Sequence, residues 1–375
     1  MNLFGRKAVA CWVIVLLISA MQVAETRERA KSIVSPEVHK DGRVSFRISA
    51  PKADDVKINC GVIKSIVGES SMKMTKDNKG LWQVTLGPLP AGIYDYTFNI
   101  DGVNNTDPAN SSVFGNRKGS RGYVEVPRLD GKLRHDEWRD VPYGTVTMHW
   151  YTSSAANGAR RRVHIYAPPG YANNLEKQYP VLYLLHGSGD NDSHWMWMGR
   201  ANTIMDNLLA DGKAVPMLIV MPDGHVNAPG GQRSPDSFER DLIDCVTPLV
   251  ESNYRIKKGR ENCAIVGLSM GGGQSLSVGL KNLDRFAWIG GFSAGTRNVG
   301  SAINELGKNP QDANQRIKLL WVAIGKDDFL LEQNHEMIAL LKSKKIKYDY
   351  KETEGTHEWS VWRGYLAEFI PQLFK

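Results

Sequence analysis

A serine flanked by glycines is the sequence feature with the most specific chemistry. Gly267-Leu268-Ser269-Met270-Gly271 follows the apolar run Cys263–Val266 and precedes a helix-like stretch. A G-x-S-x-G pattern between a strand and a helix is typical of a sharp turn that holds the serine in strained backbone geometry. The start of the following helix favours the negative charge that develops during nucleophilic attack. The pattern predicts that Ser269 is a nucleophile.

A nucleophilic serine needs a histidine as its base. Where a nucleophilic serine lies on such a strand–turn–helix motif, the acid and the histidine both follow the serine in the chain. Only His335 and His357 follow Ser269. His335 lies within a helical pattern, whereas His357 lies in a loop after the strand-like Tyr348–Thr353. We therefore predict that His357 is the base.

The acid that orients this histidine is expected in the loop after another core strand. Asp327 and Asp328 follow the apolar run Leu319–Ile324. Adjacent side chains generally point apart, so one of the two can orient His357 while the other caps the following segment. Spacing alone does not choose between them.

The oxyanion formed by nucleophilic attack on a carbonyl needs two N–H donors. One is expected from the backbone of Met270, the residue after the nucleophile, and the other from a loop after an earlier strand. Ser188 is the candidate there, because His186-Gly187-Ser188-Gly189 directly follows Val181–Leu185 and its glycines allow close approach to a substrate. His186 precedes the serine in the chain and is predicted to be structural.

Three tryptophans are candidates for substrate binding. Trp195 and Trp197 lie in the tract Ser193–Arg200, after the loop that carries Ser188, and Trp359 follows His357 by two positions. Tryptophans line pockets for aromatic groups, and they also pack in the interior. The sequence does not separate these two roles.

The segments around these motifs alternate between apolar strands and helical patterns. Strands are expected at Val181–Leu185, Met217–Met221, Cys263–Val266 and Leu319–Ile324, and helices at Ala201–Asp211, Phe238–Ser252, Gly271–Leu283 and Glu332–Lys344. Such a pattern predicts a mostly parallel sheet with helices on both faces, in which sites form at the carboxyl ends of the strands. Residues 141–375 are therefore predicted to form one α/β domain.

Residues 30–127 have a different pattern, with short strands separated by turn residues. Alternation is clear in Val44–Ile48, Trp82–Leu86 and Tyr94–Ile100, and Asp77–Gly80 is typical of a turn. No helical period is present. The pattern predicts an immunoglobulin-like β-sandwich, and the polar, basic residues 128–140 that follow predict a linker.

Residues 1–24 are predicted to be a secretory signal peptide. Arg6 and Lys7 precede the apolar run Ala8–Ala20, and small residues near Ala20 and Ala24 offer cleavage sites. A membrane span needs about 20 apolar residues, which is more than this run contains, so an uncleaved N-terminal anchor is the second interpretation. We expect a secreted or periplasmic protein that has no membrane attachment after cleavage.

Composition limits the classes of partner. The chain has 47 Lys and Arg against 40 Asp and Glu, and its basic runs are short and far apart. Because a nucleic-acid-binding protein concentrates such charge on one element, no nucleic acid partner is expected. Cleavage leaves Cys60, Cys245 and Cys263, with no Cys/His cluster, so neither a metal nor another cofactor is expected. Buried inert thiols are the favoured interpretation, and a bond between Cys245 and Cys263 stays open.

Residues 141–375 resemble the esterase D group of the α/β-hydrolases, in particular carbohydrate esterase family 1. The resemblance rests on four segments, Tyr179–Gly187, Gly267–Gly273, Gly325–Asp328 and His357–Arg363. It implies an α/β-hydrolase fold, with Asp328 rather than Asp327 as the acid. It also supports Ser188 and Met270 as the oxyanion donors.

Residues 30–127 resemble the family 48 carbohydrate-binding modules. The matching segments are Gly42–Pro51, Gly92–Tyr96 and Asp107–Asn110. Sugar-binding modules need exposed aromatic rings, whereas the aromatic residues here occupy alternating strand positions that fit a core, namely Trp82, Tyr94, Tyr96 and Phe98. A structural spacer is therefore the rival of glycan binding for this domain.

The two resemblances imply a secreted serine esterase that hydrolyses acyl esters on plant cell-wall polysaccharide, with feruloyl esters of arabinoxylan as the leading substrate. An acetyl xylan esterase would use the same residues with a smaller pocket. An enterochelin-type siderophore esterase and a mycolyl-type acyltransferase also fit the architecture. The alternative outside the enzymes is a glycan-binding protein with a decayed hydrolase domain, against which the complete set Ser269, His357 and Asp328 argues. The oligomeric state is not predicted.

Overall fold

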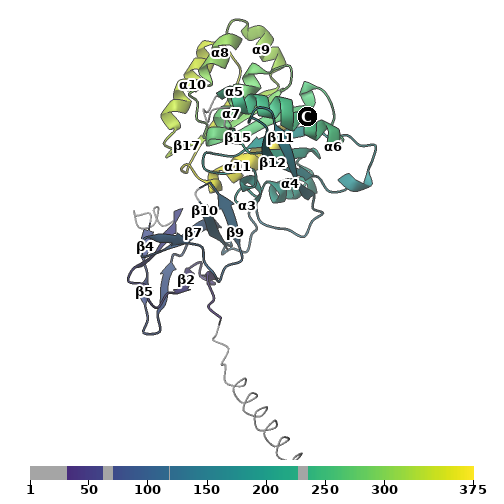
Figure 1. The fold of residues 1–375 in the computed structure, drawn as a ribbon. Coiled ribbons are helices and arrows are strands. Elements are labelled where there is room, and N and C mark those ends of the chain that lie inside the picture. Colours follow the sequence, from purple (N-terminus) through teal and green to yellow (C-terminus); the bar gives the residue numbers. More distant parts are fainter. Residues whose placement is uncertain (1–31, 62–70, 118, 227–234) are drawn as a thin grey trace, which may run out of the picture. The chain divides into compact units, whose positions relative to one another are not determined.

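The computed structural model describes residues 32–61, 71–117, 119–226 and 235–375. The predicted signal peptide, residues 1–24, lies outside these ranges. No helix within them is long and apolar enough to cross a bilayer. The described chain forms two compact units (Figure 1). The first contains the residues up to Leu89 together with Tyr96–Ser112, and the second contains Pro90–Asp95 and Val113–Lys375.

Short strands build the β-rich N-terminal region. One antiparallel sheet has the order β1-β2-β6-β5, formed by β1 (Glu37–Val38), β2 (Val44–Ser49), β6 (Leu81–Leu86) and β5 (Thr75–Lys76). A second sheet contains, in order, β4 (Ser71–Lys73), β3 (Val56–Cys60), β7 (Gly92–Ile100), β10 (Gly119–Val126) and β9 (Val113–Asn116), with β8 (Val103–Asn105) paired to β7. The strand-rich pattern predicted for this region is therefore present.

The aromatic side chains of the first unit all lie in its interior. Its described residues contain four, Phe46, Trp82, Tyr96 and Phe98, and each is buried. Tyr96 contacts Phe46 and Phe98 edge to face, with ring centroids 4.7 and 5.9 Å away. Within the described part of this unit, no aromatic ring is exposed to stack on a sugar, because these rings supply the core instead.

An eight-stranded mixed sheet forms the centre of the second unit, with the order β11-β12-β14-β13-β15-β16-β17-β18. Its strands are β11 (Thr145–Ser153), β12 (Ala159–Ala167), β14 (Leu218–Pro222), β13 (Val181–Leu185), β15 (Cys263–Leu268), β16 (Trp288–Phe292), β17 (Leu319–Gly325) and β18 (Asp349–Thr353). β12 pairs antiparallel with both β11 and β14. The other six strands, from β14 through β13 to β18 in the sheet order, are parallel to one another. The carboxyl ends of the parallel strands therefore meet at one edge of the sheet.

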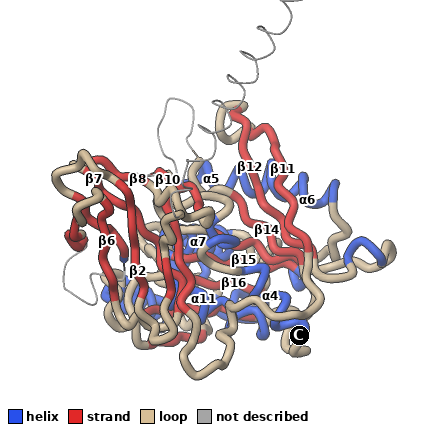
Figure 2. The backbone as a smooth tube through the Cα atoms, turned by 90° about the horizontal axis from the view of Figure 1, so that it is seen from below, coloured by secondary structure: helices blue, strands red, loops and turns tan. Residues whose placement is uncertain are grey.

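Helices cover both faces of this sheet, as predicted (Figure 2). On one face α5 (Pro235–Asp241), α6 (Thr247–Asn253), α7 (Ser269–Lys281), α8 (Gly300–Leu306) and α10 (Leu331–Ser343) contribute to one buried apolar cluster. On the other face α3 (His194–Trp197), α4 (Ala201–Ala210) and α11 (Trp359–Phe369) contribute to a second cluster. The side chains of β13 alternate between the two, since Tyr183 points to the first and Leu182 and Leu184 to the second. The strands are apolar throughout because both of their sides are buried.

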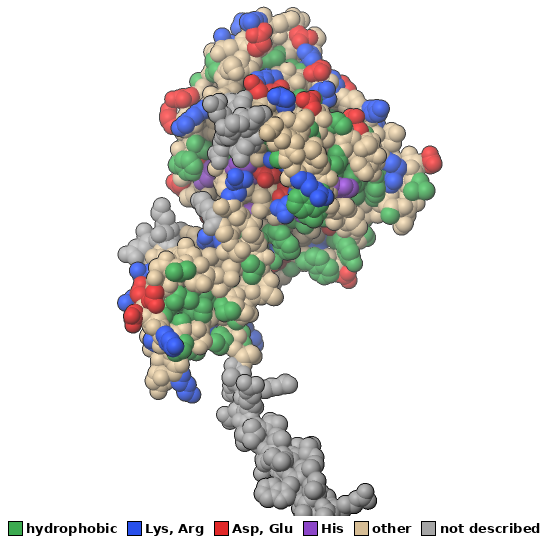
Figure 3. Space-filling view, viewed as in Figure 1, with side chains coloured by type: hydrophobic (Ala, Val, Ile, Leu, Met, Phe, Trp, Pro, Cys, Tyr) green, Lys and Arg blue, Asp and Glu red, His purple; other side chains and the backbone are tan. Residues whose placement is uncertain are grey.

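The remaining helical segments are short. They are α9 (Pro310–Arg316), the 3₁₀ turns Tyr171–Asn173, Arg260–Asn262 and Ile370–Gln372, and the π-helical turn Leu242–Val246. The π turn lies between α5 and α6, so the helix predicted over Phe238–Ser252 is not regular. On the face drawn in Figure 3, basic and acidic side chains are interspersed rather than segregated.

Most residues of the predicted linker 128–140 are exposed, but two of its acidic residues are buried. Asp136 and Glu137 are buried, with 2% and 7% of their surfaces exposed. Asp136 forms ion pairs with Arg134 at 2.8 Å and with the buried Arg363 of α11 at 2.5 Å. The Asn207 side chain donates hydrogen bonds to the carbonyls of His135 and Glu137. A polar segment can be buried when its charges are paired in this way, and hydropathy alone does not reveal the pairing.

Residues 113–126, which the sequence groups with the N-terminal domain, belong to the second unit. The Arg117 amide donates to the carbonyl of Gly189 at 3.0 Å, and the Asn191 side chain donates to the carbonyl of Gly115 at 2.8 Å. The Phe114 ring lies edge to face against His194, 5.2 Å between centroids. These contacts join β9 to the loop that follows β13.

Candidate active site

Ser269 is the first residue of α7, directly after β15, and its backbone has the positive φ of 53°. The flanking glycines are required by space. A Cβ atom at Gly267 would collide with the Gly271 carbonyl, and one at Gly271 would collide with the carbonyl of His186. The turn therefore presents the serine hydroxyl at the carboxyl end of a central strand, where the G-x-S-x-G pattern predicts it.

Ser269, His357 and Asp328 form a continuous hydrogen-bonded series. The Nε2 atom of His357 is 2.9 Å from the Ser269 hydroxyl, and its Nδ1 atom is 2.8 and 3.0 Å from the two carboxylate oxygens of Asp328. Asp328 comes from the loop after β17, and His357 from the loop after β18. With Nδ1–H donating to Asp328, Nε2 is left to accept the serine proton. Asp327 is exposed and does not contact the histidine through its side chain.

The Asp328 carboxylate is held in its charged form. Burial alone would raise its pKa, but hydrogen bonds from His357, from the amide of Leu330 and from the hydroxyl of Ser293 outweigh burial and lower the pKa. Ser293 in turn accepts a 3.0 Å hydrogen bond from Nε1–H of Trp362. Both side chains are buried, and Ser293 has the positive φ of 45°. Ser293 lies outside the predicted motifs, and Trp362 lies in the segment His357–Arg363 without a predicted role, so this support of the acid was not predicted.

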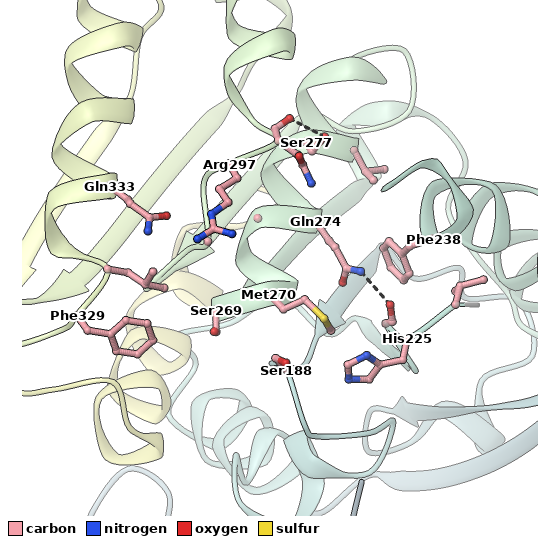
Figure 4. Close-up of a pocket in the computed structure, with 17 residues that line it drawn as sticks. Ser188, His225, Phe238, Ser269, Met270, Gln274, Ser277, Arg297, Phe329 and Gln333 are labelled. Carbon is pink, nitrogen blue, oxygen red and sulfur yellow. Dashed lines mark hydrogen bonds between the residues drawn. The ribbon is translucent and has the colours of Figure 1, made fainter. Parts of the chain in front are cut away.

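A cavity of about 670 Å³ opens beside the serine (Figure 4). Ser188 and Met270, the two predicted oxyanion donors, both line it together with Ser269. The labelled side chains lie on two sides of the serine. Met270, Gln274, Phe238 and His225 lie on one side, and Phe329 lies on the other. In the view Gln333 lies above Phe329, and Arg297 lies above Ser269. The serine thus opens on a space large enough for both halves of an ester.

The chain was compared with models of known protein families. The family model "Esterase", described as "Putative esterase", matches residues 154–373. The chain belongs to this esterase family. It is accordingly a carboxylic ester hydrolase, and its resemblance to carbohydrate esterase family 1 is confirmed.

Two relatives show what kinds of protein this chain is similar to. The esterase is 32% identical over 349 residues to an endo-1,4-beta-xylanase/feruloyl esterase of Xylanibacter ruminicola, an alignment that covers 91% of this chain and 46% of the relative. It is 25% identical over 228 residues to an acetyl esterase of Caldicellulosiruptor saccharolyticus, covering 52% of this chain and 83% of the relative. The chain therefore spans less than half of the length of the first relative.

Solved structures agree on the α/β-hydrolase fold. A ferulic acid esterase is 28% identical, with a TM-score of 0.55, over 61% of this chain and 97% of that one. A family 1 ferulic acid esterase from the anaerobic fungus Anaeromyces mucronatus is 26% identical, with a TM-score of 0.54, over 64% and 93%. An enterobactin esterase from Shigella flexneri reaches a TM-score of 0.65 over 88% of this chain and 92% of that one, at 17% identity, which shows a common fold alone.

The three predicted substrate-binding tryptophans are not brought to the cavity of the esterase. Trp195 is 1% exposed, and its Nε1–H donates to the Leu185 carbonyl at 2.9 Å. Trp359 packs edge to face against Trp195 and Trp362, with centroid distances of 5.2 and 5.4 Å. Trp197 is 43% exposed but does not line the cavity. Trp195 and Trp359 pack in the apolar cluster under α3 and α11, because the sheet faces in this region need large apolar side chains.

The histidine in the loop after β13 has structural contacts, as predicted. His186 is 1% exposed, its Nδ1 atom is 2.8 Å from the Gly187 carbonyl, and its Nε2 atom accepts from the Gly224 amide at 2.9 Å. Both ring nitrogens are thereby used to fix two loops that reach the cavity. His335 does not take part in this arrangement. It pairs with Glu352 at 2.6 Å on the surface.

The cysteines and the acidic groups form no further centre. Cys245 and Cys263 are free thiols, so the bond left open between them is not formed. Burial raises the pKa of Cys263 to about 12, which keeps that thiol protonated. Within the described ranges no group of three or more His, Cys, Asp or Glu side chains is placed to hold a metal ion.

Proposed function

We propose that this esterase is a secreted or periplasmic serine esterase that hydrolyses acyl esters on plant cell-wall polysaccharide, with feruloyl esters of arabinoxylan as its substrate. The observation that carries the proposal is the hydrogen-bonded series of Ser269, His357 and Asp328 beside a 670 Å³ cavity. Its closeness to a xylanase/feruloyl esterase supports the choice of substrate.

The mechanism follows from the direction of these hydrogen bonds. His357 accepts the proton of Ser269 while the serine oxygen attacks the ester carbonyl, and Asp328 stabilises the resulting imidazolium. The amides of Ser188 and Met270 hold the oxyanion, and each such donor is worth about 100- to 1000-fold in rate. The tetrahedral intermediate collapses as His357 protonates the departing alcohol, which leaves an acyl-serine. Water that is deprotonated by His357 then attacks the acyl-serine and releases the acid.

The lining of the cavity favours an aromatic acyl group. Phe238, Val226, Met270 and Val278 supply apolar lining, and Phe238 and Met270 lie on the Gln274 side of the serine. A planar acyl group buries its faces against such side chains, whereas an acetyl group would leave most of the space to water. The similarity to an acetyl esterase keeps acetylated xylan as the second candidate.

The N-terminal region is proposed to be an immunoglobulin-like sandwich that resembles a carbohydrate-binding module in its strands. Its buried aromatic side chains, which include Trp82, Tyr96 and Phe98, speak against a stacking platform of the usual kind. A spacer role fits these observations better than glycan binding. Export by the segment 1–24 stays a proposal on the sequence pattern alone.

The choice of acyl group is tested by comparing two simple esters. We expect the mature protein to hydrolyse methyl ferulate with at least about tenfold higher kcat/KM than 4-nitrophenyl acetate, after correction for the better leaving group of the latter, because the apolar side of the cavity binds the aromatic acid. Turnover of the acetate alone would contradict the feruloyl assignment and favour acetylated xylan. Turnover of neither would favour a siderophore ester, acyl transfer or a binding role.

A further inference from the structure

Phe329 is an unusual residue for its position. It follows Asp328, and the amide of the next residue, Leu330, donates to Asp328 at 2.9 Å, so its backbone is fixed by the acid itself. Its side chain is nevertheless 75% exposed, more than any other large apolar side chain in the described ranges. An exposed aromatic ring on a fixed turn beside a reactive histidine is poised to contact a ligand.

The ring lies against the base. The centroids of Phe329 and His357 are 4.5 Å apart, and the planes are tilted by 54°. Trp362 also packs edge to face with the histidine ring, at 4.8 Å between centroids, but it is buried, whereas Phe329 lines the cavity. A group that approaches Nε2 of His357 from the cavity therefore passes next to Phe329.

The chemistry decides which half of the ester this is. His357 must hand its proton to the departing alcohol, so the alcohol oxygen lies beside Nε2 when the bond breaks. The acyl carbon is held by Ser269, and its oxyanion by the amides on the Ser188 and Met270 side. The alcohol half is thus directed toward Phe329, and the acyl half toward the apolar side chains across the serine.

Figure 4 shows the same division. Phe329 lies on the opposite side of Ser269 from Phe238 and His225. In this view Gln333 lies above Phe329, and Arg297 lies above Ser269. A sugar ring offers C–H groups to an aromatic face and hydroxyl groups to amide and guanidinium donors. Phe329 with Gln333 and Arg297 offers this pairing of an apolar platform with polar donors.

We propose that Phe329, with Gln333 of the same cavity lining, is the subsite for the sugar that carries the ester. This subsite rests on the proposed function, because it takes the alcohol half of the same substrate. It is separate from the acyl side, and its occupant is the furanose or pyranose ring whose hydroxyl is esterified. A simple alkyl ester does not use it.

Two substrates with one acyl group test the subsite. We would measure kcat/KM for feruloylated arabino-xylo-oligosaccharide and for methyl ferulate with the wild type, Phe329→Ala, Phe329→Leu and Phe329→Tyr. We expect Phe329→Ala and Phe329→Leu to lower kcat/KM for the sugar ester about tenfold, since an aromatic contact of this kind is worth about one decade, while methyl ferulate changes less than about twofold. Phe329→Tyr keeps a ring and is expected to stay near the wild type. Tyr143→Ala removes an exposed ring outside the cavity and serves as the matched control.

The outcomes separate the subsite from the proposed function. An equal loss on both substrates would overturn the subsite, because Phe329 would then act through His357 alone. Unchanged sugar-ester kinetics in Phe329→Ala would overturn it as well. If the wild type cleaves neither ferulate ester, the feruloyl assignment fails by itself, and the same ratio is then read on acetylated xylo-oligosaccharide against 4-nitrophenyl acetate.

Discussion

At the scale of single residues, some side chains of the candidate active site are positioned by their own turn and others by residues distant in the chain. Ser269 is set by its own turn, in which Gly267 and Gly271 leave no room for a Cβ atom. Asp328 depends on a partner that is distant in the chain, because Ser293 reaches it from the loop after β16 and is itself fixed by Trp362. A triad of three residues therefore rests on at least two more.

Ser293 is a positioning residue, and its loss is predicted to weaken the triad without removing it. Ser293→Ala takes one donor from Asp328 and leaves the buried Nε1–H of Trp362 without its acceptor. We expect kcat to fall about tenfold, the cost of about one buried hydrogen bond, with little change in KM. Because Asp328 loses a hydrogen bond that lowers its pKa, the acid limb of the kcat profile should move to higher pH.

Ser293→Gly is the matched control for this prediction. Glycine also lacks the hydroxyl but accepts the positive φ of 45° without strain. Equal losses in the two variants assign the effect to the hydroxyl. Full activity in Ser293→Gly would contradict the prediction, since backbone strain in the alanine variant would then be the cause.

At the scale of elements, the segment 128–140 fixes α11, the helix that begins two residues after His357. Arg363 of this helix is 2% exposed, forms an ion pair with Asp136 and donates to the Met198 carbonyl at 2.8 Å. Burial alone would raise the pKa of Asp136. The positive charges of Arg363 and Arg134 outweigh burial, so the pKa lies below its ordinary value. The pair therefore ties the start of the second unit to the helix behind the active site.

Breaking this pair is predicted to destabilise the fold in a pH-dependent way. Asp136→Asn leaves Arg363 buried without its countercharge, and we expect a loss of about 3–5 kcal/mol in the free energy of unfolding at pH 7. A lowered folded pKa gives stabilisation that is present above the unfolded value of about 4 and is lost as pH falls through the folded pKa. The difference between variant and wild type should therefore narrow below about pH 4 in denaturant titrations.

Asp130→Asn provides the comparison in the same segment. Asp130 pairs with Arg128, but both side chains are more than 40% exposed, so we expect Asp130→Asn to leave the free energy of unfolding close to that of the wild type. Equal effects of the two substitutions would show that segment 128–140 acts as the solvated linker that its polarity indicates.

The elements also show which expectations a single sequence can support. The sequence predicted β13, β14, β15, β17 and β18 and the positions of Ser269 and His357, because apolar runs, a glycine-flanked turn and chain order are local or ordered signals. Only the family resemblance chose Asp328 over Asp327. The burial of Trp195 and Asp136 was not predicted, since a tryptophan or a charge is buried by partners that lie far away in the chain. The same applies to Phe329 and Ser293, whose roles depend on His357 and Asp328 rather than on any pattern around themselves.

At the scale of the whole molecule, two compact units divide the chain at other points than composition indicates. Residues 113–126 and 128–140 belong to the same compact unit as the hydrolase sheet, so the second unit begins well before the first strand of that sheet. The first unit keeps its aromatic side chains inside. Chemistry and sugar recognition are therefore both assigned to the second unit, and the proposed sugar subsite at Phe329 supplies the contact that a separate binding module would otherwise have to provide.

The most direct test of this account is the rate of ester hydrolysis by Ser269→Ala, with Ser343→Ala, an exposed serine in α10, as control. We predict that Ser269→Ala lowers kcat for methyl ferulate by at least about 10⁴-fold, because the variant lacks the hydroxyl that is hydrogen-bonded to His357. The control is expected to match the wild type. A Ser269→Ala protein that kept more than about a tenth of the wild-type rate would contradict the account at its centre.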